Sequence, residues 1–284
     1  LITVDCGITN NKEVKKLKKA GVKVIITDHH METEKLPPAN AILNCSLKRE
    51  KYPFKKLAGV GMAFKLSQGL FREKINHPRD PSLKSRGDYN FEAFEKWLLD
   101  LVTIGTIGDV SPILGENRVL VKYGLMVLNK TQRRGLQELI RVSSLSNGHN
   151  PNDEIPLGEE LYDLSVRKVA FQLVPRINSA GRLDDANISY KLLTTEDEIE
   201  AIALARDIQE KNSERQKLAD EILIEAEEMF GEVDNKNKIL IASSENWLPG
   251  MVGLVAGKLK DKYARPIILF SQNDKEFIGS GRSI

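Results

Sequence analysis

Two apolar segments near the start of the chain each stop at an aspartate, and this pattern limits the folds that the chain can adopt. Residues 1–4 end at Asp5, and the β-branched run of residues 22–27 ends at Asp28. A helical pattern between them stops at Gly21, and glycine is typical of helix C-termini. We therefore predict a β-α-β unit of a parallel sheet, with a carboxylate at the end of each of two neighbouring strands.

The residues around these strand ends suit a metal site. His29 and His30 directly follow Asp28. Two carboxylates at the same sheet edge repel each other unless a cation lies between them. Asp109, which follows a third apolar segment and has glycines nearby, adds another acidic group. Carboxylates with imidazoles favour Mn²⁺ or Mg²⁺ over a structural Zn²⁺ site, and paired metals of this kind activate water for attack on phosphorus.

Each of these residues also has a purely structural interpretation. Asp5 alone would be a turn or helix-capping residue, and the two histidines would be polar loop residues. The acidic and imidazole motifs together favour a site. Cys6 could be a ligand or a nucleophile, but because no second cysteine is near it in sequence, we predict a small buried residue.

The composition is that of a globular protein large enough for two domains. The chain has 284 residues, of which 41% are hydrophobic and 29% charged. No apolar run approaches the roughly 20 residues of a membrane helix and no signal peptide opens the chain, so we expect no membrane association. Two cysteines cannot form a disulfide framework, which indicates a reducing, cytoplasmic location.

Charge and periodicity together predict an α/β protein of two bodies. Residues 194–230 hold 12 acidic and 4 basic side chains in a helical pattern, so the rest of the chain is net basic, which weakly favours a polyanionic substrate. We expect a parallel-sheet domain over residues 1–193, a connecting helix over 194–230 and the start of a smaller α/β domain over 231–284.

The finer pattern predicts the elements of these bodies. The expected helices cover residues 11–20, 58–70, 91–104, 117–128, 165–174 and 252–263. The expected strands cover residues 41–44, 238–242 and 266–270 in addition to the first two. Residues 72–90 and 143–158 are predicted to be polar surface segments, and residues 175–183 a loop.

Several ordered motifs resemble a known family. Val4-Asp5-Cys6-Gly7, Thr27-Asp28-His29-His30 and Gly105-Thr106-Ile107-Gly108-Asp109-Val110 resemble motifs of the DHH phosphoesterase superfamily. Residues 57–66, 175–183, 212–216, 247–259 and 279–283 are similar to segments of its RecJ branch. The resemblance runs over the whole chain and implies a DHH catalytic domain joined by a long helix to a DHH-associated (DHHA1) domain.

That resemblance implies a hydrolase specific for single-stranded DNA. Members of the branch are 5′→3′ exonucleases of DNA repair and recombination that use Mn²⁺ or Mg²⁺ at a two-metal site and release 5′-mononucleotides. The implied partners are single-stranded DNA and a helicase or single-strand binding protein.

The resemblance also assigns roles around the acidic and imidazole residues. Asp5 would bridge two metals, with His29 and Asp109 as further ligands. Asp28 would orient the histidines, and His30 would contact the scissile phosphate or help to protonate the leaving oxygen. The glycines around Asp109 would let the backbone approach the metals.

A second group of residues is expected to hold phosphate groups. Arg176 and Arg182, in the loop predicted over residues 175–183, could each donate two parallel hydrogen bonds to phosphate oxygens. The alternative is that they form salt bridges to the acidic helix. Residues 279–283 resemble a phosphate-cradling turn of the DHH-associated domain. The predicted phosphate-binding residues are Arg176, Asn178, Arg182, Gly279, Ser280, Gly281, Arg282 and Ser283. Trp247 could stack on a base, although a core position is the simpler interpretation.

Departures from the family pattern and two competing functions complete these expectations. The first Asp-x-Asp motif and the C-terminal oligonucleotide-binding fold of the family are missing, and Leu248 stands where many relatives have histidine. We therefore expect a fragment that is inactive or weakly active alone.

Two functions compete with the exonuclease. They are a DHH phosphoesterase for short oligonucleotides, 3′-phosphoadenosine phosphate or cyclic dinucleotides, and an inactive scaffold. The RecJ-like segments over residues 175–183 and 212–216 argue against the small-substrate phosphoesterase. The presence of Asp5, Asp28, His29, His30 and Asp109 argues against the inactive scaffold.

Overall fold

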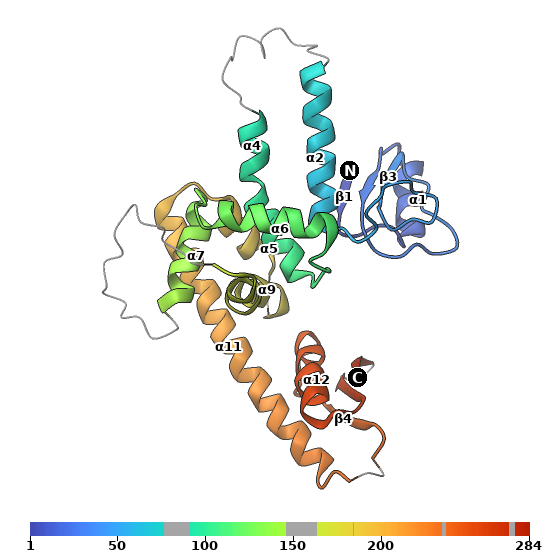
Figure 1. Ribbon diagram of the computed structural model, residues 1–284. Coiled ribbons are helices and arrows are strands. Elements are labelled where there is room, and N and C mark those ends of the chain that lie inside the picture. Colours follow the sequence, from blue (N-terminus) through green and yellow to red (C-terminus); the bar gives the residue numbers. More distant parts are fainter. Residues whose placement is uncertain (77–90, 146–163, 184, 235–236, 273–275) are drawn as a thin grey trace. The chain divides into compact units, whose positions relative to one another are not determined.

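The computed structural model describes residues 1–76, 91–145, 164–183, 185–234, 237–272 and 276–284 (Figure 1). These residues form two compact units. The first unit comprises Leu1–Gln132 with the described part of Pro151–Val174, and the second comprises the described part of Arg133–Asn150 with Pro175–Ile284. Each unit contains a three-stranded sheet covered by helices, which confirms the predicted α/β class.

The sheet of the first unit is parallel throughout, in the order β1 (Ile2–Val4), β2 (Ile25–Thr27) and β3 (Ala41–Leu43). Val4 pairs with Thr27, and Thr27 pairs with Leu43, so the three strands end at the same level. Helix α1 (Asn11–Lys19) connects β1 to β2, as the sequence predicted. The residues that follow the strands therefore share one edge of the sheet.

The end of α1 explains why β2 is shorter than the predicted strand over residues 22–27. Gly21 has φ +77°, its N–H donates to the Lys18 carbonyl (3.1 Å), and Val22 N–H donates to the Leu17 carbonyl (3.0 Å). This pair of bonds is the Schellman arrangement, which satisfies the last carbonyls of the helix. Val22 is thus occupied by the helix terminus and is absent from the sheet.

Helices form the rest of the first unit. They are α2 (Gly59–Asn76), α4 (Phe91–Trp97), α5 (Leu99–Gly108), α6 (Gly115–Leu128), α8 (Val166–Lys168) and the π-helix η1 (Val169–Leu173). Helix α5 contacts α2, α6 and η1, and α2 contacts β1 and β2. The helix predicted over residues 91–104 is therefore two helices, and the second continues to Gly108 because its buried face packs against three neighbours.

The glycines before Asp109 have a different role from the predicted one. Gly105 and Gly108 lie within α5, not in a flexible loop. A Cβ at Gly105 would come within 2.7 Å of Val60 Cγ1, and one at Gly108 within 3.3 Å of Val174. These glycines therefore permit close packing of α5 on its neighbours, and the predicted approach of their backbone to metals is not needed to explain them.

The second unit contains a mixed sheet and five helices among its described residues. They are α7 (Arg134–Leu145), α9 (Val174–Leu183), α10 (Asn187–Thr194), α11 (Glu198–Phe230), β4 (Leu240–Ser244), α12 (Pro249–Tyr263), β5 (Ile267–Gln272) and β6 (Phe277–Arg282). Strand β5 is parallel to β4 and antiparallel to β6. The 33-residue helix α11 contacts α7, α10, α12 and β4. It begins at Glu198 rather than Thr194, because Asp197 accepts a hydrogen bond from Glu200 N–H (2.7 Å) as its N-cap.

Two segments predicted to be loops or turns are regular elements. Residues 175–183 belong to α9, which continues the π-helix η1; the wider turn places Pro175 in the first turn of α9, where proline is tolerated. Residues 279–282 belong to β6, and a Cβ at Gly279 would come within 2.4 Å of Phe270 Cδ1 on β5. That glycine gives room to a neighbouring ring rather than making a turn.

Two predicted surface segments fall mostly beyond the described residues. Helix α2 continues to Asn76 and α7 to Leu145, so the beginnings of the segments over residues 72–90 and 143–158 are helical. Residues 77–90 and 146–158 lie outside the described residues. Across the part of the chain that is described, every helix is too short or too polar to cross a bilayer.

Candidate metal centre

Asp5 leaves β1 in an unusual backbone conformation. Its φ is +61°, which non-glycine residues rarely adopt, while its N–H donates to the Thr27 carbonyl (2.9 Å) on β2. This turn leaves the carboxylate 55% exposed. The next residue, Cys6, is exposed as well, so the prediction of a buried cysteine was wrong. The direction of the Asp5 side chain therefore depends on this backbone conformation.

Asp28 is buried and serves as an acceptor for the loop that carries both histidines. Its Oδ1 accepts from His29 N–H (2.8 Å), His30 N–H (3.2 Å) and His30 Nδ1 (2.7 Å), and its Oδ2 accepts from Ile8 N–H (2.9 Å). Burial would raise the pKa of this carboxyl, but the bonds from Ile8, His30 and His29 outweigh it, so the pKa is lowered. Asp28 is therefore ionised and fixes the loop.

His29 points between two carboxylates. Its Nε2 lies 3.1 Å from Asp5 Oδ1 and 3.8 Å from Asp109 Oδ1, and its side chain is 16% exposed. This nitrogen is nevertheless buried without a hydrogen-bond partner. Buried polar atoms almost always have a partner. A divalent cation bound by this imidazole nitrogen and the two carboxylates would be that partner.

His30 presents one ring nitrogen outwards. Its Nδ1 is bonded to Asp28, which leaves Nε2 for a ligand or substrate. That bond raises the pKa of His30, against a smaller lowering by burial and with help from the charges of Asp28, Asp5 and Asp109. One ligand atom each from Asp5, His29 and His30 lies within 4.8 Å of the others. The predicted residues thus converge on one point.

Asp109 joins the group from the helical layer. It is the C-cap of α5, its Oδ2 accepts from Ser111 Oγ (2.6 Å), and its side chain is 33% exposed. Val110, the next residue, has φ +57° although it is β-branched, which is a strained conformation. Such strain is often stored at functional sites, where it holds a side chain in one direction.

Gly59, the first residue of α2, is a member of the centre that residue-by-residue reasoning missed. A Cβ at this position would come within 2.1 Å of Asp5 Oδ1. The sequence carried a signal for it, because residues 58–61 read Ala-Gly-Val-Gly at the start of a helix predicted to pack closely on the sheet. Glycine is therefore the residue that leaves room for the Asp5 carboxylate.

Comparison with known proteins shows a family match over the first part of the chain. The protein-family model described as "DHH family, N-terminal domain" matches residues 1–106. This range includes four of the five converging residues and leaves out Asp109. The match to the DHH family thus covers the first 106 residues of the chain. The chain is 38% identical over 286 residues to the "Single-stranded-DNA-specific exonuclease RecJ" of Bacillus subtilis, covering 100% of this chain and 32% of that protein. The RecJ of Dickeya dadantii is 33% identical over 290 residues, with 47% of its length covered.

Solved structures agree with the sequence matches to the DHH family. "Crystal structure of exonuclease RecJ bound to manganese" matches all of this chain and 62% of its own at a TM-score of 0.75 and 31% identity. A crystal structure of RecJ in complex with Mn²⁺ from Thermus thermophilus matches with a TM-score of 0.76, 31% identity and 37% of that chain covered. The present chain spans between about a third and half of the curated relatives it matches.

The predicted phosphate-binding residues lie in the second unit. Arg176 is buried on α9, and its Nε donates to Gln209 Oε1 (2.7 Å), while Asn178 and Arg182 are exposed on the same helix. Arg182 Nη1 donates to the Gly250 carbonyl (3.1 Å) at the start of α12. Burial lowers the pKa of Arg176, and the charge of Arg215 lowers it further.

The remaining predicted residues lie in β6 or directly after it. Arg282 Nη1 donates to Ser280 Oγ and to the Gly281 carbonyl, both at 2.8 Å. Ser280 Oγ and Arg282 Nη2 lie so close to Gly253 of α12 that a Cβ there would be 3.0 and 3.1 Å from them. Ser283 directly follows the strand. Trp247, by contrast, is 2% exposed and its Nε1 donates to Glu225 Oε2 (2.7 Å), so the core interpretation of this residue is confirmed.

Proposed function

We propose that this chain provides the catalytic and phosphate-binding residues of a metal-dependent exonuclease that degrades single-stranded DNA from the 5′ end and releases 5′-mononucleotides, in DNA repair and recombination. The observation that carries this proposal is the unsatisfied Nε2 of His29 beside the carboxylates of Asp5 and Asp109. The similarity to RecJ exonucleases over the whole chain supports the reaction class.

Asp5, His29 and Asp109 are the proposed ligands of Mn²⁺ or Mg²⁺. When bound, such a cation lowers the pKa of water and stabilises charge on phosphate oxygens. The RecJ structures bound to manganese or magnesium support this choice of metals. Hard carboxylate oxygens with one imidazole suit both ions, and the family resemblance favours a two-metal site.

Asp28 and His30 have separate proposed roles. Asp28 holds both histidines through its three hydrogen bonds with them. His30 directs Nε2 outwards and keeps a proton more readily than an isolated histidine because its pKa is raised by the Asp28 bond. That nitrogen would contact the scissile phosphate and donate a proton to the leaving oxygen.

The second unit would hold the phosphates of the DNA strand. The proposed phosphate ligands are Arg176, Asn178, Arg182, Gly279, Ser280, Gly281, Arg282 and Ser283, which combine guanidinium forks, an amide, hydroxyls and backbone N–H groups. In domain terms, we propose a catalytic domain over residues 1–193, a connecting helix over 194–230 and a substrate-binding domain from residue 231.

The proposal extends to cellular context. Both cysteines are free, which fits a reducing cytoplasm. A helicase that supplies single strands, or a single-strand binding protein that coats them, would be the expected protein partner because the substrate must be unpaired.

Hydrolysis of 5′-labelled single-stranded DNA by the whole protein that contains this chain, with and without Mn²⁺, tests the proposal. We expect mononucleotide release that EDTA abolishes and that Asp109→Ala lowers by at least about 100-fold. Asp261→Ala, on the exposed surface of α12, is the matched control and should retain activity. Equal rates on duplex DNA or on a cyclic dinucleotide would assign the centre to another DHH phosphoesterase activity, and metal binding without any hydrolysis would indicate a scaffold.

A further inference from the structure

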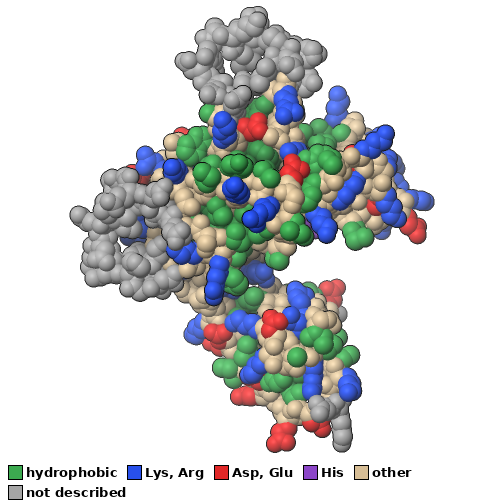
Figure 2. Space-filling view, in the orientation of Figure 1, with side chains coloured by type: hydrophobic (Ala, Val, Ile, Leu, Met, Phe, Trp, Pro, Cys, Tyr) green, Lys and Arg blue, Asp and Glu red, His purple; other side chains and the backbone are tan. Residues whose placement is uncertain are grey.

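Helix α6 has an exposed face that carries only apolar and basic side chains. Among the side chains of α6 and the turn that follows it, the exposed ones are Arg118, Val119, Lys122, Tyr123, Met126 and Lys130. Val119, Tyr123 and Met126 are 53%, 51% and 60% exposed and recur at helical spacing, so they form one row. Figure 2 shows hydrophobic side chains interspersed with Lys and Arg where α6 lies in Figure 1.

The positive charge of this face is not offset by α6 itself. Glu116 is the single acidic residue of this fully described helix. Its carboxylate accepts from Tyr52 OH (2.7 Å) and pairs with Lys65 Nζ (2.6 Å), so it is turned into the protein. Lys122 Nζ lies 5.7 Å from the centroid of the Tyr123 ring, which places a cation beside an exposed aromatic face.

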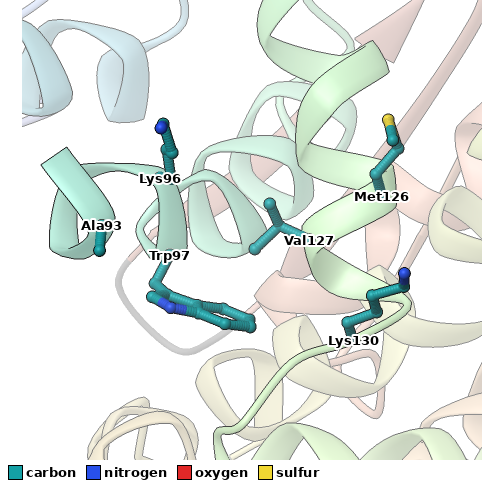
Figure 3. A pocket seen from close by; sticks show the side chains of 6 residues that line it. All are labelled: Ala93, Lys96, Trp97, Met126, Val127 and Lys130. Atoms are coloured by element: carbon teal, nitrogen blue, oxygen red, sulfur yellow. The ribbon is translucent and has the colours of Figure 1, made fainter.

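A pocket adjoins one end of the row. It has a volume of about 310 Å³ and is lined by Ala93, Lys96, Trp97, Met126, Val127 and Lys130. Figure 3 shows the Trp97 ring and the Val127 side chain extending into the space between α4 and α6, with Lys96 and Lys130 on opposite sides. The size is at the lower end of small-ligand sites, which are about 300–1,000 Å³. An apolar pocket with two ammonium groups at its margin suits a flat ring attached to a phosphate.

We propose that this basic-aromatic face, meaning the exposed side chains of α6 together with Lys96 and Trp97, binds single-stranded DNA outside the metal centre. Aromatic rings stack on bases of any sequence, and interspersed cations neutralise the phosphates. The 14-residue helix is about 21 Å long, so it can follow several nucleotides. The inference rests on the proposed nuclease function, because it assigns a strand of that substrate to the face.

The face is rigidly joined to the metal centre. Helix α6 begins six residues after Asp109, and Asn117 Nδ2 donates to the carbonyls of Pro112 (3.1 Å) and Lys56 (2.6 Å). Asn117 is fully buried, and Glu116 is held by its two partners. A strand bound along α6 would therefore be held at a fixed position relative to Asp109, and its binding would strengthen the hold on long substrates without altering the reacting bond.

An acidic protein segment is the other occupant that positive charge could attract. An amphipathic helix of such a protein would need a continuous apolar groove for its anchoring side chains. The face instead places the cations Arg118, Lys122 and Lys130 beside the row of apolar and aromatic side chains over its whole length, which favours a polyanion that also carries bases.

Binding of a fluorescent single-stranded oligonucleotide in EDTA tests the proposal without hydrolysis. The variant is Lys122→Gln/Tyr123→Ala, and the matched control is Lys217→Gln/Tyr190→Ala, two exposed positions of the second unit. Loss of one stacked base and one phosphate contact should weaken binding at least about tenfold and reduce the dependence of log K on log salt by about 0.7. The control should bind like the wild type.

Substrate length separates this face from the metal centre. The variant should raise KM for a long strand while leaving the hydrolysis of a 5′-phosphorylated trinucleotide unchanged. Trp97→Phe should abolish the quenching of tryptophan fluorescence by DNA, because Trp247 is buried. Unchanged DNA affinity, equal losses on long and short substrates, or selective loss of binding to an acidic peptide would each overturn the proposal. DNA binding at the face with no hydrolysis by the wild type would overturn the proposed function and leave this inference standing.

Discussion

The Cα of Gly59 faces the carboxylate of Asp5 so closely that a methyl group at this position would lie within 2.1 Å of Asp5 Oδ1. The same carboxylate oxygen is 3.1 Å from His29 Nε2. Any side chain on the first residue of α2 must therefore displace Asp5 or the helix. Since α2 also contacts β1 and β2, the helix itself is held in place, and Asp5 is the group that would move.

We therefore expect Gly59→Ala to weaken Mn²⁺ binding about 10- to 100-fold, the range found when partners that orient metal ligands are removed. Isothermal titration calorimetry with Mn²⁺ would measure the change. Gly69→Ala is the control, because Gly69 lies in the same helix, has open space at its Cβ position and gains the same helix propensity. Equal Mn²⁺ affinities of the two variants would contradict the steric role of Gly59.

Replacement of His29 should remove the stabilisation that Mn²⁺ gives to the folded protein. Mn²⁺ at about 100 times its Kd should stabilise the wild type by about 2.7 kcal/mol, because the ion binds the folded state. His29→Ala should lose this stabilisation, while Met31→Ala, at an 85% exposed position nearby, should keep it. Thermal unfolding with and without Mn²⁺ measures the difference. A normal Mn²⁺ shift in His29→Ala would mean that the unsatisfied Nε2 is not a ligand.

Asp28→Asn should lower the free energy of unfolding by about 1–3 kcal/mol, because an amide cannot accept all the hydrogen bonds that the buried carboxylate accepts. The pKa of Asp28 is lower in the folded state than its ordinary value of 3.8. The carboxylate therefore contributes fully above that pH, and its contribution is lost as the pH falls through the folded-state pKa.

Urea unfolding in EDTA at several pH values measures this contribution. The difference between wild type and Asp28→Asn should be largest at about pH 5, where His30 is protonated and Asp28 is ionised. It should fall as the pH rises through the raised pKa of His30 and shrink below about pH 4. Asp261→Asn, at a 74% exposed side chain, should differ little from the wild type over the whole range. A difference that persists undiminished in acid would show that Asp28 does not act through its ionised form.

Trp247→Phe should destabilise the second unit without affecting the binding of DNA. The indole is 2% exposed and donates to Glu225, so phenylalanine leaves a small cavity and an acceptor without its donor, a cost of about 1–3 kcal/mol. Chemical denaturation measures the loss, and binding of a labelled single strand measures the affinity. A stable variant with weakened DNA binding would instead indicate base stacking by Trp247.

The convergence of Asp5, His29 and His30 was predictable because it depends on the ends of strands. Apolar runs that stop at Asp5 and Asp28 fix which residues share a sheet edge, and the parallel pairing of β1 with β2 follows from the intervening helix. The end of a third apolar segment indicated Asp109, and the family resemblance gave it a ligand role, but its position depends on α5, a helix from another part of the first unit. No local pattern specifies that approach.

The errors arose where tertiary packing overrides local preference. Pro175 and Gly181 suggested a loop, yet α9 is helical because Ser179 and Ala180 are fully buried and the π-turn before it accommodates the proline. Gly279 suggested a turn, yet its missing side chain admits the Phe270 ring across the sheet. A glycine required by a neighbour and a glycine required by a turn look the same in sequence.

Val110 provides a test of strain beside the metal centre. It is 87% exposed and has φ +57°, a conformation that costs a β-branched residue about 1–2 kcal/mol and that asparagine adopts more easily. Val110→Asn should therefore raise the free energy of unfolding by about 1 kcal/mol. Val119→Asn is the control, because Val119 is exposed within α6 and because valine and asparagine have similar helix propensities.

The same substitution should leave Mn²⁺ affinity unchanged, because asparagine keeps the backbone turn that directs Asp109. Val110→Pro, which cannot adopt a positive φ, should instead weaken Mn²⁺ binding along with stability. If Val110→Asn were no more stable than Val119→Asn, the turn after Asp109 would not be strained. If Val110→Pro bound Mn²⁺ normally, the turn would not be what holds the Asp109 carboxylate towards His29.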